Sequence, residues 1–314
     1  MSTLYGITDL AKLQYNDPAV GLIEESLAAA PEVNAIMGRT IPGTTYKTLV
    51  RTSLPAGAFT RLNEGVNATA SVLEQRISQC YLYRNAVQID LAAENASEGL
   101  GIGDLEMIES LGVVEDALRK IGKQIWYGTT TDSKGFPGLK SVLAKGDATV
   151  TDAGGNTSNL QSSVYFVKVG IKDVHLLYGN GATLALSPFA NQTLYDANSY
   201  PYAGRVANLT SWVGMQVGNA NAVGRICNLT EAVPLTDVLL AKELALFKIG
   251  YRPTHIFMSR RSRRQLQVAR TVTLFGQSGQ GGAKSAATLF NDPDEFMGIP
   301  IITTDQILDT DAVE

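Results

Sequence analysis

Two histidines, His175 and His255, are the side chains of this sequence best suited to acid–base catalysis near neutral pH. A triad of serine, histidine and aspartate would have to use one of them. Each lies in an apolar run that is typical of a strand, one between Val174 and Leu176 and the other before Ile256. No serine has the Gly-x-Ser-x-Gly spacing of a nucleophile turn. We therefore interpret both histidines as packed or hydrogen-bonded residues and predict no catalytic residue.

Cofactor and metal motifs are equally sparse. Cys80 and Cys227 are too few for a disulfide framework or a cysteine zinc site, and we expect two buried, reduced thiols. The run 99–104 resembles a dinucleotide-binding loop, but Asp104 occupies the place of its third glycine. The run 281–285 departs from a phosphate-binding loop at a required glycine, and HExxH and EF-hand patterns are absent. The sequence therefore predicts neither a cofactor nor a metal site.

The densest cluster of charge consists of four arginines, Arg260, Arg261, Arg263 and Arg264. At consecutive helical positions they would point around most of a helix, which suits either phosphate contacts or ion pairs with neighbouring subunits. The chain has 26 basic and 30 acidic residues, so its net charge of −4 lacks the positive excess of a dedicated nucleic-acid-binding protein. We therefore favour subunit contacts for this cluster.

Composition indicates a folded chain with an ample core. Of its 314 residues, 45% are apolar and 18% charged, and the length suits one large domain or two medium ones. No run approaches the roughly 18 consecutive apolar residues of a membrane span. Residues 1–17 lack the basic and apolar regions of a secretory signal. We expect a soluble protein that stays in the cell that makes it and has no membrane partner.

The elements that would position these residues begin with a helix from Leu105 to Tyr127. Its apolar residues recur at three- and four-residue steps, which places them on one stripe. Acidic residues lie near its start and basic residues near its end, as the helix dipole favours. Gly128 is expected to end it. At about 1.5 Å per residue the helix would be roughly 35 Å long.

Strand patterns lie on both sides of this helix. Residues 44–53 and 72–89 are rich in β-branched and aromatic side chains but present no clean polar face. Such a long β-excursion cannot bury itself, which is the first indication of an assembly. Further strands are predicted at 164–169, 174–178, 212–217, 225–229 and 254–258. Two more helices are predicted, one at 237–249 capped by Thr236 and one capped by Ser259.

Seven stretches of the chain together carry a resemblance to a known family. They are 51–66, 71–75, 87–90, 163–179, 212–229, 253–261 and 298–305. Their order and spacing resemble those of tailed-bacteriophage major capsid proteins with the HK97-like fold, and in particular the podovirus-type group.

This resemblance implies an α+β chain in four parts. They are an N-terminal arm (1–40), an extended β-hairpin loop (41–90), a peripheral domain (91–232) with a spine helix at about 104–127 and a β-region at 163–230, and an axial domain (233–314). The β-region precedes the strand–helix signature at 253–270, which implies a reordered topology relative to the simplest members of the fold.

The resemblance also implies a function. The chain would be a structural subunit, not an enzyme, that self-assembles into the icosahedral shell enclosing a phage genome. Its main partners would be copies of itself, arranged in pentamers and hexamers. Portal, scaffolding and cement or decoration proteins would be further partners. Packaged double-stranded DNA would be contacted only non-specifically. It would be located in the virion and assembled in the cytoplasm of the host bacterium.

Contacts between subunits are expected from the charged residues of the extended loop and of the arginine cluster. These residues are Arg51, Arg61, Glu64, Arg76, Arg260, Arg261, Arg263 and Arg264. Two alternatives stay open, namely another virion structural protein such as a tail-tube subunit, and a cytosolic enzyme with a non-obvious site.

Overall fold

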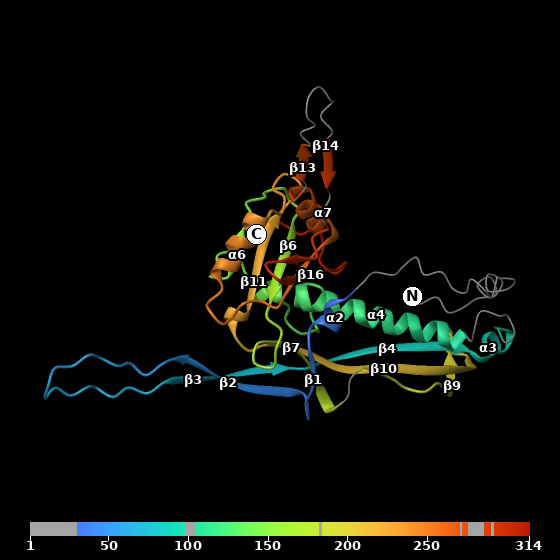
Figure 1. Ribbon diagram of the computed structural model, residues 1–314. Coiled ribbons are helices and arrows are strands. Elements are labelled where there is room, and N and C mark those ends of the chain that lie inside the picture. The colour runs from blue at the N-terminus through green and yellow to red at the C-terminus, as the bar shows by residue number, and fades with distance from the viewer. Residues whose placement is uncertain (1–29, 98–104, 182–183, 271, 276–285, 290–291) are drawn as a thin grey trace, which may run out of the picture.

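The structure consists mainly of an upper sheet that stands above the spine helix, a lower sheet that runs beneath it, and a projecting hairpin (Figure 1). The computed structural model describes residues 30–97, 105–181, 184–270, 272–275, 286–289 and 292–314. Residues 20–30, where the sequence before Pro31 also favours a helix, fall almost wholly outside the described residues, as do the glycine-rich runs 99–104 and 281–285.

The predicted spine helix is confirmed as α4 (Leu105–Tyr127). Its second half is buried through Ile121, Ile125 and Trp126, whereas its first half leaves apolar side chains such as Leu111 in solvent. Gly128 ends the helix with a φ of +58°, and a Cβ there would lie 1.9 Å from the amide nitrogen of Gly138. Only glycine fits this position, because both the left-handed backbone and the close approach exclude a side chain.

A six-stranded lower sheet lies beneath the spine helix (Figure 1). Its strand order is β1 (Gly38–Thr40), β7 (Val174–Tyr178), β10 (Pro201–Val217) and β4 (Tyr81–Asp90), with β8 (Ala185–Leu186) and β9 (Ala190–Tyr195) also pairing with β10. Antiparallel pairing of β4 and β10 runs from Gly204 opposite Asp90 to Val213 opposite Tyr81. This long pairing gives the sheet its elongated shape.

A second six-stranded sheet forms the upper body. Its order is β15 (Glu295–Phe296), β16 (Ile299–Thr303), β12 (His255–Met258), β6 (Ser162–Val167), β11 (Val223–Leu229) and β5 (Val150–Asp152). Every residue of β6 is buried because both faces of the sheet are covered. Val164 and Phe166 pack into the cluster under α6 (Asp237–Leu246) and α7 (Arg260–Ala269). Tyr165 faces the other way and stacks on Trp126 of the spine helix at 4.8 Å.

The remaining elements are short or lie at the edges. They are α2 (Glu32–Ala35), α3 (Leu91–Ser97), α5 (Leu139–Val142), the single turns Gly128–Thr130, Gly179–Gly181 and Ala220–Ala222, the hairpin β2 (Thr45–Ser53) and β3 (Val72–Gln79), and the hairpin β13 (Val272–Phe275) and β14 (Ala286–Leu289).

The strands predicted after the spine helix are present, although the one predicted at 212–217 is only the end of the longer strand β10 (Pro201–Val217), and neighbours in sequence enter different sheets. β6 and β11 belong to the upper sheet, whereas β7 and β10 belong to the lower one. The β-region at 163–230 is therefore shared between the sheets, and the predicted domain limit at residue 232 cuts across the upper sheet. The four-part division of the chain stays a prediction.

Two further boundaries of predicted strands and helices were wrong. The strand pattern over 72–89 is two strands, because the chain leaves the hairpin at Cys80 and enters the lower sheet as β4. The helix predicted at 237–249 begins after Thr236, whose side chain accepts a hydrogen bond from the amide of Leu239, but it ends at Leu246. Ser259 caps α7 as predicted.

Candidate subunit-contact surface

The hairpin β2–β3 extends straight away from the body of the molecule (Figure 1). Its strands pair from Thr45 opposite Gln79 to Ser53 opposite Val72. Its root is held firmly, since the amide of Cys80 donates to the carbonyl of Thr44 at 2.8 Å. Next to this root the hairpin still contacts the body, since Gln216 donates to the Thr48 hydroxyl and Arg76 donates to the carbonyl of Gly218. Beyond these contacts it has solvent on both faces, as the mixed polar and apolar pattern of its sequence predicts.

Apolar side chains cover much of this hairpin without being buried. The exposed ones are Leu49, Leu54, Phe59, Leu62, Val66, Val72, Leu73 and Ile77. Phe59 and Leu62 reach 109% and 96% exposure, so the described residues of the chain give neither of them any cover. Burying such a side chain contributes about 1.5–3 kcal/mol. A surface of this kind is stabilised by contact with another molecule.

The backbone of the loop 54–71 also lacks partners within the chain. All its residues are described, and its backbone hydrogen bonds are confined to two ties: Ala56 with the Thr69 hydroxyl, and Arg61 with Glu64. The remaining amides and carbonyls of both arms of this loop face solvent, as on an exposed sheet edge, which favours pairing with another chain.

Two of the predicted contact residues meet at the far end of the hairpin. The amide of Arg61 donates to Oε2 of Glu64 at 3.1 Å, and the amide of Glu64 donates to the carbonyl of Arg61 at 3.2 Å. Arg51 lies exposed on β2, and Arg76 donates from β3 to the carbonyl of Gly218 at 3.1 Å. A role for these four residues between subunits stays a prediction.

The arginine cluster on α7 is paired within its own subunit. The partners are Asp305 for Arg260, Asp309 for Arg261, Asp292 and Asp294 for Arg263, and Glu231 for Arg264. These ion pairs account for the cluster without a neighbouring chain. Arg260 and Arg264 keep 75% and 64% of their side chains exposed, so these two are the most available to a neighbour.

A groove of about 530 Å³ lies between the spine helix, the start of β4 and the loop 131–136. We call it the α4–β4 groove; Tyr81, Leu82, Tyr83, Arg84, Lys120, Ile121, Gln124, Thr131, Asp132, Lys134, Gly135, Phe136 and Val213 line it. The side-chain amide of Gln124 donates to the carbonyl of Phe136 at 2.7 Å and joins two elements that line the groove. Burial and the carboxylate of Asp116 raise the pKa of Tyr83 to about 12, so its hydroxyl keeps its proton at neutral pH.

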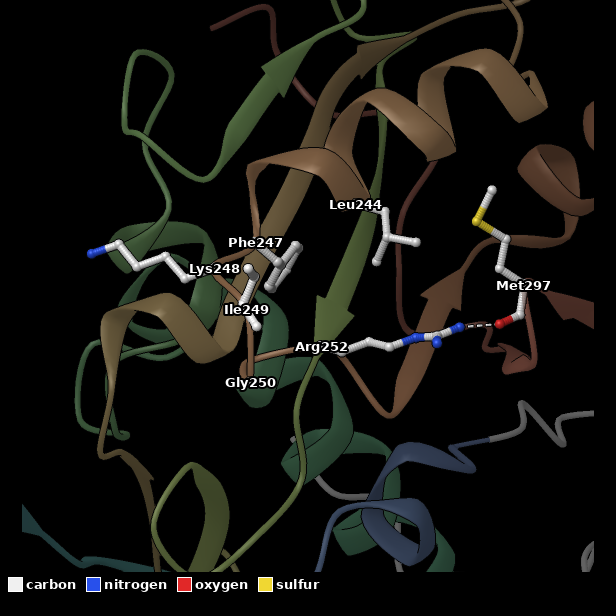
Figure 2. A pocket seen from close by; sticks show the side chains of 7 residues that line it. All are labelled: Leu244, Phe247, Lys248, Ile249, Gly250, Arg252 and Met297. Carbon is white, nitrogen blue, oxygen red and sulfur yellow. Dashed lines mark hydrogen bonds between the residues drawn. The ribbon is translucent and has the colours of Figure 1, made fainter.

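A second cavity, of about 500 Å³, lies at the corner that follows α6. Figure 2 shows Leu244, Phe247 and Ile249 at this α6 corner, with the Lys248 side chain pointing away from the others. Arg252 crosses the corner and donates to the carbonyl of Met297. Ile249 is 103% exposed, so this corner is also an uncovered apolar surface.

The histidines occupy positions that serve packing. His175 is fully buried in β7, and its ring meets that of Tyr46 edge to face at 5.8 Å. Burial, with Arg39 nearby, lowers the pKa of His175, and burial lowers that of His255, whose Nδ1 lies 2.9 Å from the Thr254 hydroxyl. Cys80 and Cys227 are free and buried, as predicted.

The described ranges of the chain also bear on metal binding and on insertion into a membrane. Within them, no group of three or more histidine, cysteine, aspartate or glutamate side chains could hold a metal ion. The helices of the described part of the chain include none long and apolar enough to cross a bilayer.

Four side chains with ionisable acidic or basic groups are buried in the described part of the chain and were not predicted, namely Glu32, Arg225, Glu243 and Asp311. Arg225 is 1% exposed in β11 and binds both carboxylate oxygens of Glu314, at 2.7 and 2.9 Å. Glu243 is fully buried on α6, and this burial raises its pKa to about 7. The sequence could have indicated Arg225, because it is the lone arginine in the apolar run Val223–Leu229. The sequence could also have indicated Glu243, because it follows the buried Leu240 by three residues and so lies on the same face of the helix.

A fully covered upper sheet, a long spine helix over a lower sheet and a projecting hairpin define a shell subunit of the HK97-like class. The family model that matches is described as major capsid protein GP7, over residues 28–313. The chain belongs to this family, and it is a capsid shell subunit that assembles with copies of itself and is located in the virion.

Solved structures agree on the fold. A chain from the structure of bacteriophage Epsilon15 matches with a TM-score of 0.69 at 17% identity, covering 99% of this chain and 97% of that chain. A chain of the bacteriophage JBD30 capsid matches with a TM-score of 0.51 at 12% identity, covering 90% and 93%. A chain of the capsid of Myoviridae phage XM1 matches with a TM-score of 0.50 at 10% identity, covering 73% and 100%. No curated protein sequence matches this chain.

Proposed function

We propose that this chain builds a closed icosahedral shell of pentamers and hexamers around a double-stranded DNA genome. The observation that carries the proposal is the hairpin, which exposes Phe59 and Leu62 completely at the end of an arm with no cover of its own. In a capsid protein family, a copy of the same chain is the abundant partner that can cover it. Many such moderate contacts add up through multivalency to a stable shell.

The finer parts of the proposal come from the resemblance to the capsid family. The N-terminal arm and the hairpin loop reach neighbouring subunits, while the domains at 91–232 and 233–314 form the wall and the ring around each axis. Portal, scaffolding and decoration proteins meet surfaces of the assembled shell, and assembly takes place in the cytoplasm of the host bacterium. The chain acts through contacts and has no catalytic role.

Contact with the packaged DNA is non-specific in this proposal. The net charge of −4 and the pairing of all four α7 arginines with carboxylates support weak binding. Tight binding to phosphates would release counterions and hold the DNA to the wall during packaging.

Negative-stain electron microscopy of the purified, full-length protein tests the proposal. We expect closed particles of uniform size under assembly conditions. Tubes would instead indicate a tail-tube subunit, and a clean monomer at high concentration would contradict both structural roles. In that last case, the double variant His175→Ala/His255→Ala tests an enzymatic role, because a histidine-dependent activity would be lost.

A further inference from the structure

We propose that Glu32 is a proton-dependent switch: its protonated form holds α2 against the spine helix, and its ionised form releases α2. The chain reaches α2 from residues 1–29, so the switch controls the point at which that segment joins the body. It is a property of the single subunit and goes beyond the proposed function.

Glu32 lies where three elements meet. α2 packs beside α4 at the place where the upper body joins the spine helix (Figure 1). Glu32 is 0% exposed there, and a Cβ added at Gly122 of α4 would overlap its Oε1. Its polar neighbours are Trp126 of α4 and Thr304, which follows β16. The carboxyl group therefore fills a space that a glycine in the spine helix leaves open.

The charge of an ionised Glu32 would have no compensation in this space. Within the described part of the chain, no lysine or arginine pairs with it and neither of its carboxyl oxygens has a well-formed hydrogen bond. α4 presents Gly122 and Trp126 to it, and neither is charged. Asp305 carries the same sign as Glu32 and is itself bound by Arg260. A buried carboxylate without a cation is costly, so the neutral form is favoured.

The pH dependence has a definite direction. Burial raises the pKa of Glu32 above its ordinary value of 4.5, with Asp305 adding to the rise and with Thr304 and Trp126 opposing it. An undocked Glu32 in water keeps its ordinary pKa. The docked state is therefore favoured at low pH and loses its advantage as pH rises through the raised pKa, about tenfold for each further pH unit.

α2 is small enough to move without the rest of the body. It spans only Glu32–Ala35, and Ile36 is the fully buried apolar residue next to it. β1 follows it and stays paired with β7 in the lower sheet. Undocking α2 therefore exposes the carboxyl group to water while both sheets remain intact.

The other buried carboxyl groups are less suited to this role. Asp311 has a cation beside it, because Nζ of Lys140 lies 3.2 Å from its Oδ2. Glu243 lies in the ten-residue helix α6, which is anchored by the fully buried Leu240. Only a larger rearrangement would bring Glu243 to water, whereas four residues suffice for Glu32.

Hydrogen exchange on full-length, unassembled subunits tests the inference. The amides of residues 34–36 donate to the carbonyls of Pro31 and Glu32, so their protection reports on α2. Protection is expressed relative to an unstructured chain at the same pH, which removes the pH dependence of the exchange chemistry. We expect it to fall at least tenfold between about pH 5 and pH 9 in the natural protein, while the amides of β6 keep theirs.

The variant Glu32→Gln keeps the shape of the side chain but cannot ionise. It is expected to hold the protection of residues 34–36 constant over the same range. The matched control is Glu115→Gln on the spine helix, at a partly exposed pair with Arg119, which should follow the natural protein. Constant protection in the natural protein, or an equal fall in Glu32→Gln, would overturn the switch.

A second variant covers the case in which Glu32→Gln does not fold. Gly122→Ala fills the space of the carboxyl group and is expected to lower the protection of residues 34–36 at least tenfold at pH 5, with β6 unaffected. Unchanged protection in Gly122→Ala would overturn the inference. Since every measurement uses unassembled subunits, a failure to form shells would contradict the proposed function alone.

Discussion

Glu243 is a buried carboxyl group of the upper body, and its ionisation changes the free energy of unfolding. It is fully buried, and a Cβ added at Gly224 of β11 would lie 2.4 Å from its Oε1. Burial raises its pKa from 4.5 to about 7, although Thr151 partly opposes this rise. Between these values the folded protein holds a proton that the unfolded chain has lost. The free energy of unfolding therefore falls as pH rises from about 4.5 to 7.

The variant Glu243→Gln is expected to remove this pH dependence. At about 1.4 kcal/mol per pKa unit, it should be up to about 3 kcal/mol more stable than the natural protein at pH 8, and equal to it near pH 4.5. Urea unfolding of unassembled subunits across this range measures the difference. Glu231→Gln, at an exposed ion pair with Arg264, is the matched control. Equal pH slopes for Glu243→Gln and the natural protein would refute the assignment.

Arg225 and Arg264 allow a second comparison at the residue scale. Arg225 holds the pKa of the Glu314 carboxyl below its ordinary value, against the effect of burial, and also donates to Ser163 and to the carbonyl of Leu143. Arg225→Ala leaves these acceptors without their donor, so we expect a loss of about 3 kcal/mol in unfolding free energy. Arg264→Ala removes an exposed pair and should cost less than about 1 kcal/mol. Equal losses in chemical denaturation would contradict this ranking.

At the scale of elements, the hairpin separates stability from assembly. The variant Phe59→Ser/Leu62→Ser changes two side chains that are exposed in the described part of the subunit, so its unfolding free energy should change by less than about 0.5 kcal/mol. Shell formation should nevertheless fall at least a hundredfold, since each lost side chain removes about 1.5–3 kcal/mol per contact. Sedimentation of assembly mixtures measures the yield.

A conservative variant provides the control for this prediction. Phe59→Leu/Leu62→Met keeps the tip apolar and should assemble at close to the natural yield. If the serine and conservative variants assembled equally well, the tip would not be a contact surface.

At the scale of the whole molecule, the body of the subunit has a buried core, whereas the hairpin exposes apolar side chains. The two sheets share the spine helix, whose Trp126 packs against Tyr165 and Phe257 of the upper sheet. This shared core makes one rigid support from which the hairpin projects. Closed particles in the electron microscope are the outcome expected of such a subunit, because a shell closes only if repeated contacts hold one angle between neighbouring copies.

The sequence by itself determined the local elements and the class of protein. The stripe on Leu105–Tyr127, the caps Thr236 and Ser259, and the alternation on the hairpin depend on periodicity and local hydrogen bonds, which neighbouring residues fix. The order of seven such stretches sufficed for the family.

Only the tertiary structure decided the long-range pairings. Sequence could not show that β6 and β7 separate into different sheets, that Cys80 divides the hairpin from the lower sheet, or that the α7 arginines pair with Asp292, Asp305 and Asp309. Strand pairing and ion pairing join residues far apart in the chain, and their choice depends on which surfaces the whole core brings together. The same reason explains why the α4–β4 groove, built from β4, the spine helix and the loop after it, had no signature in any single segment.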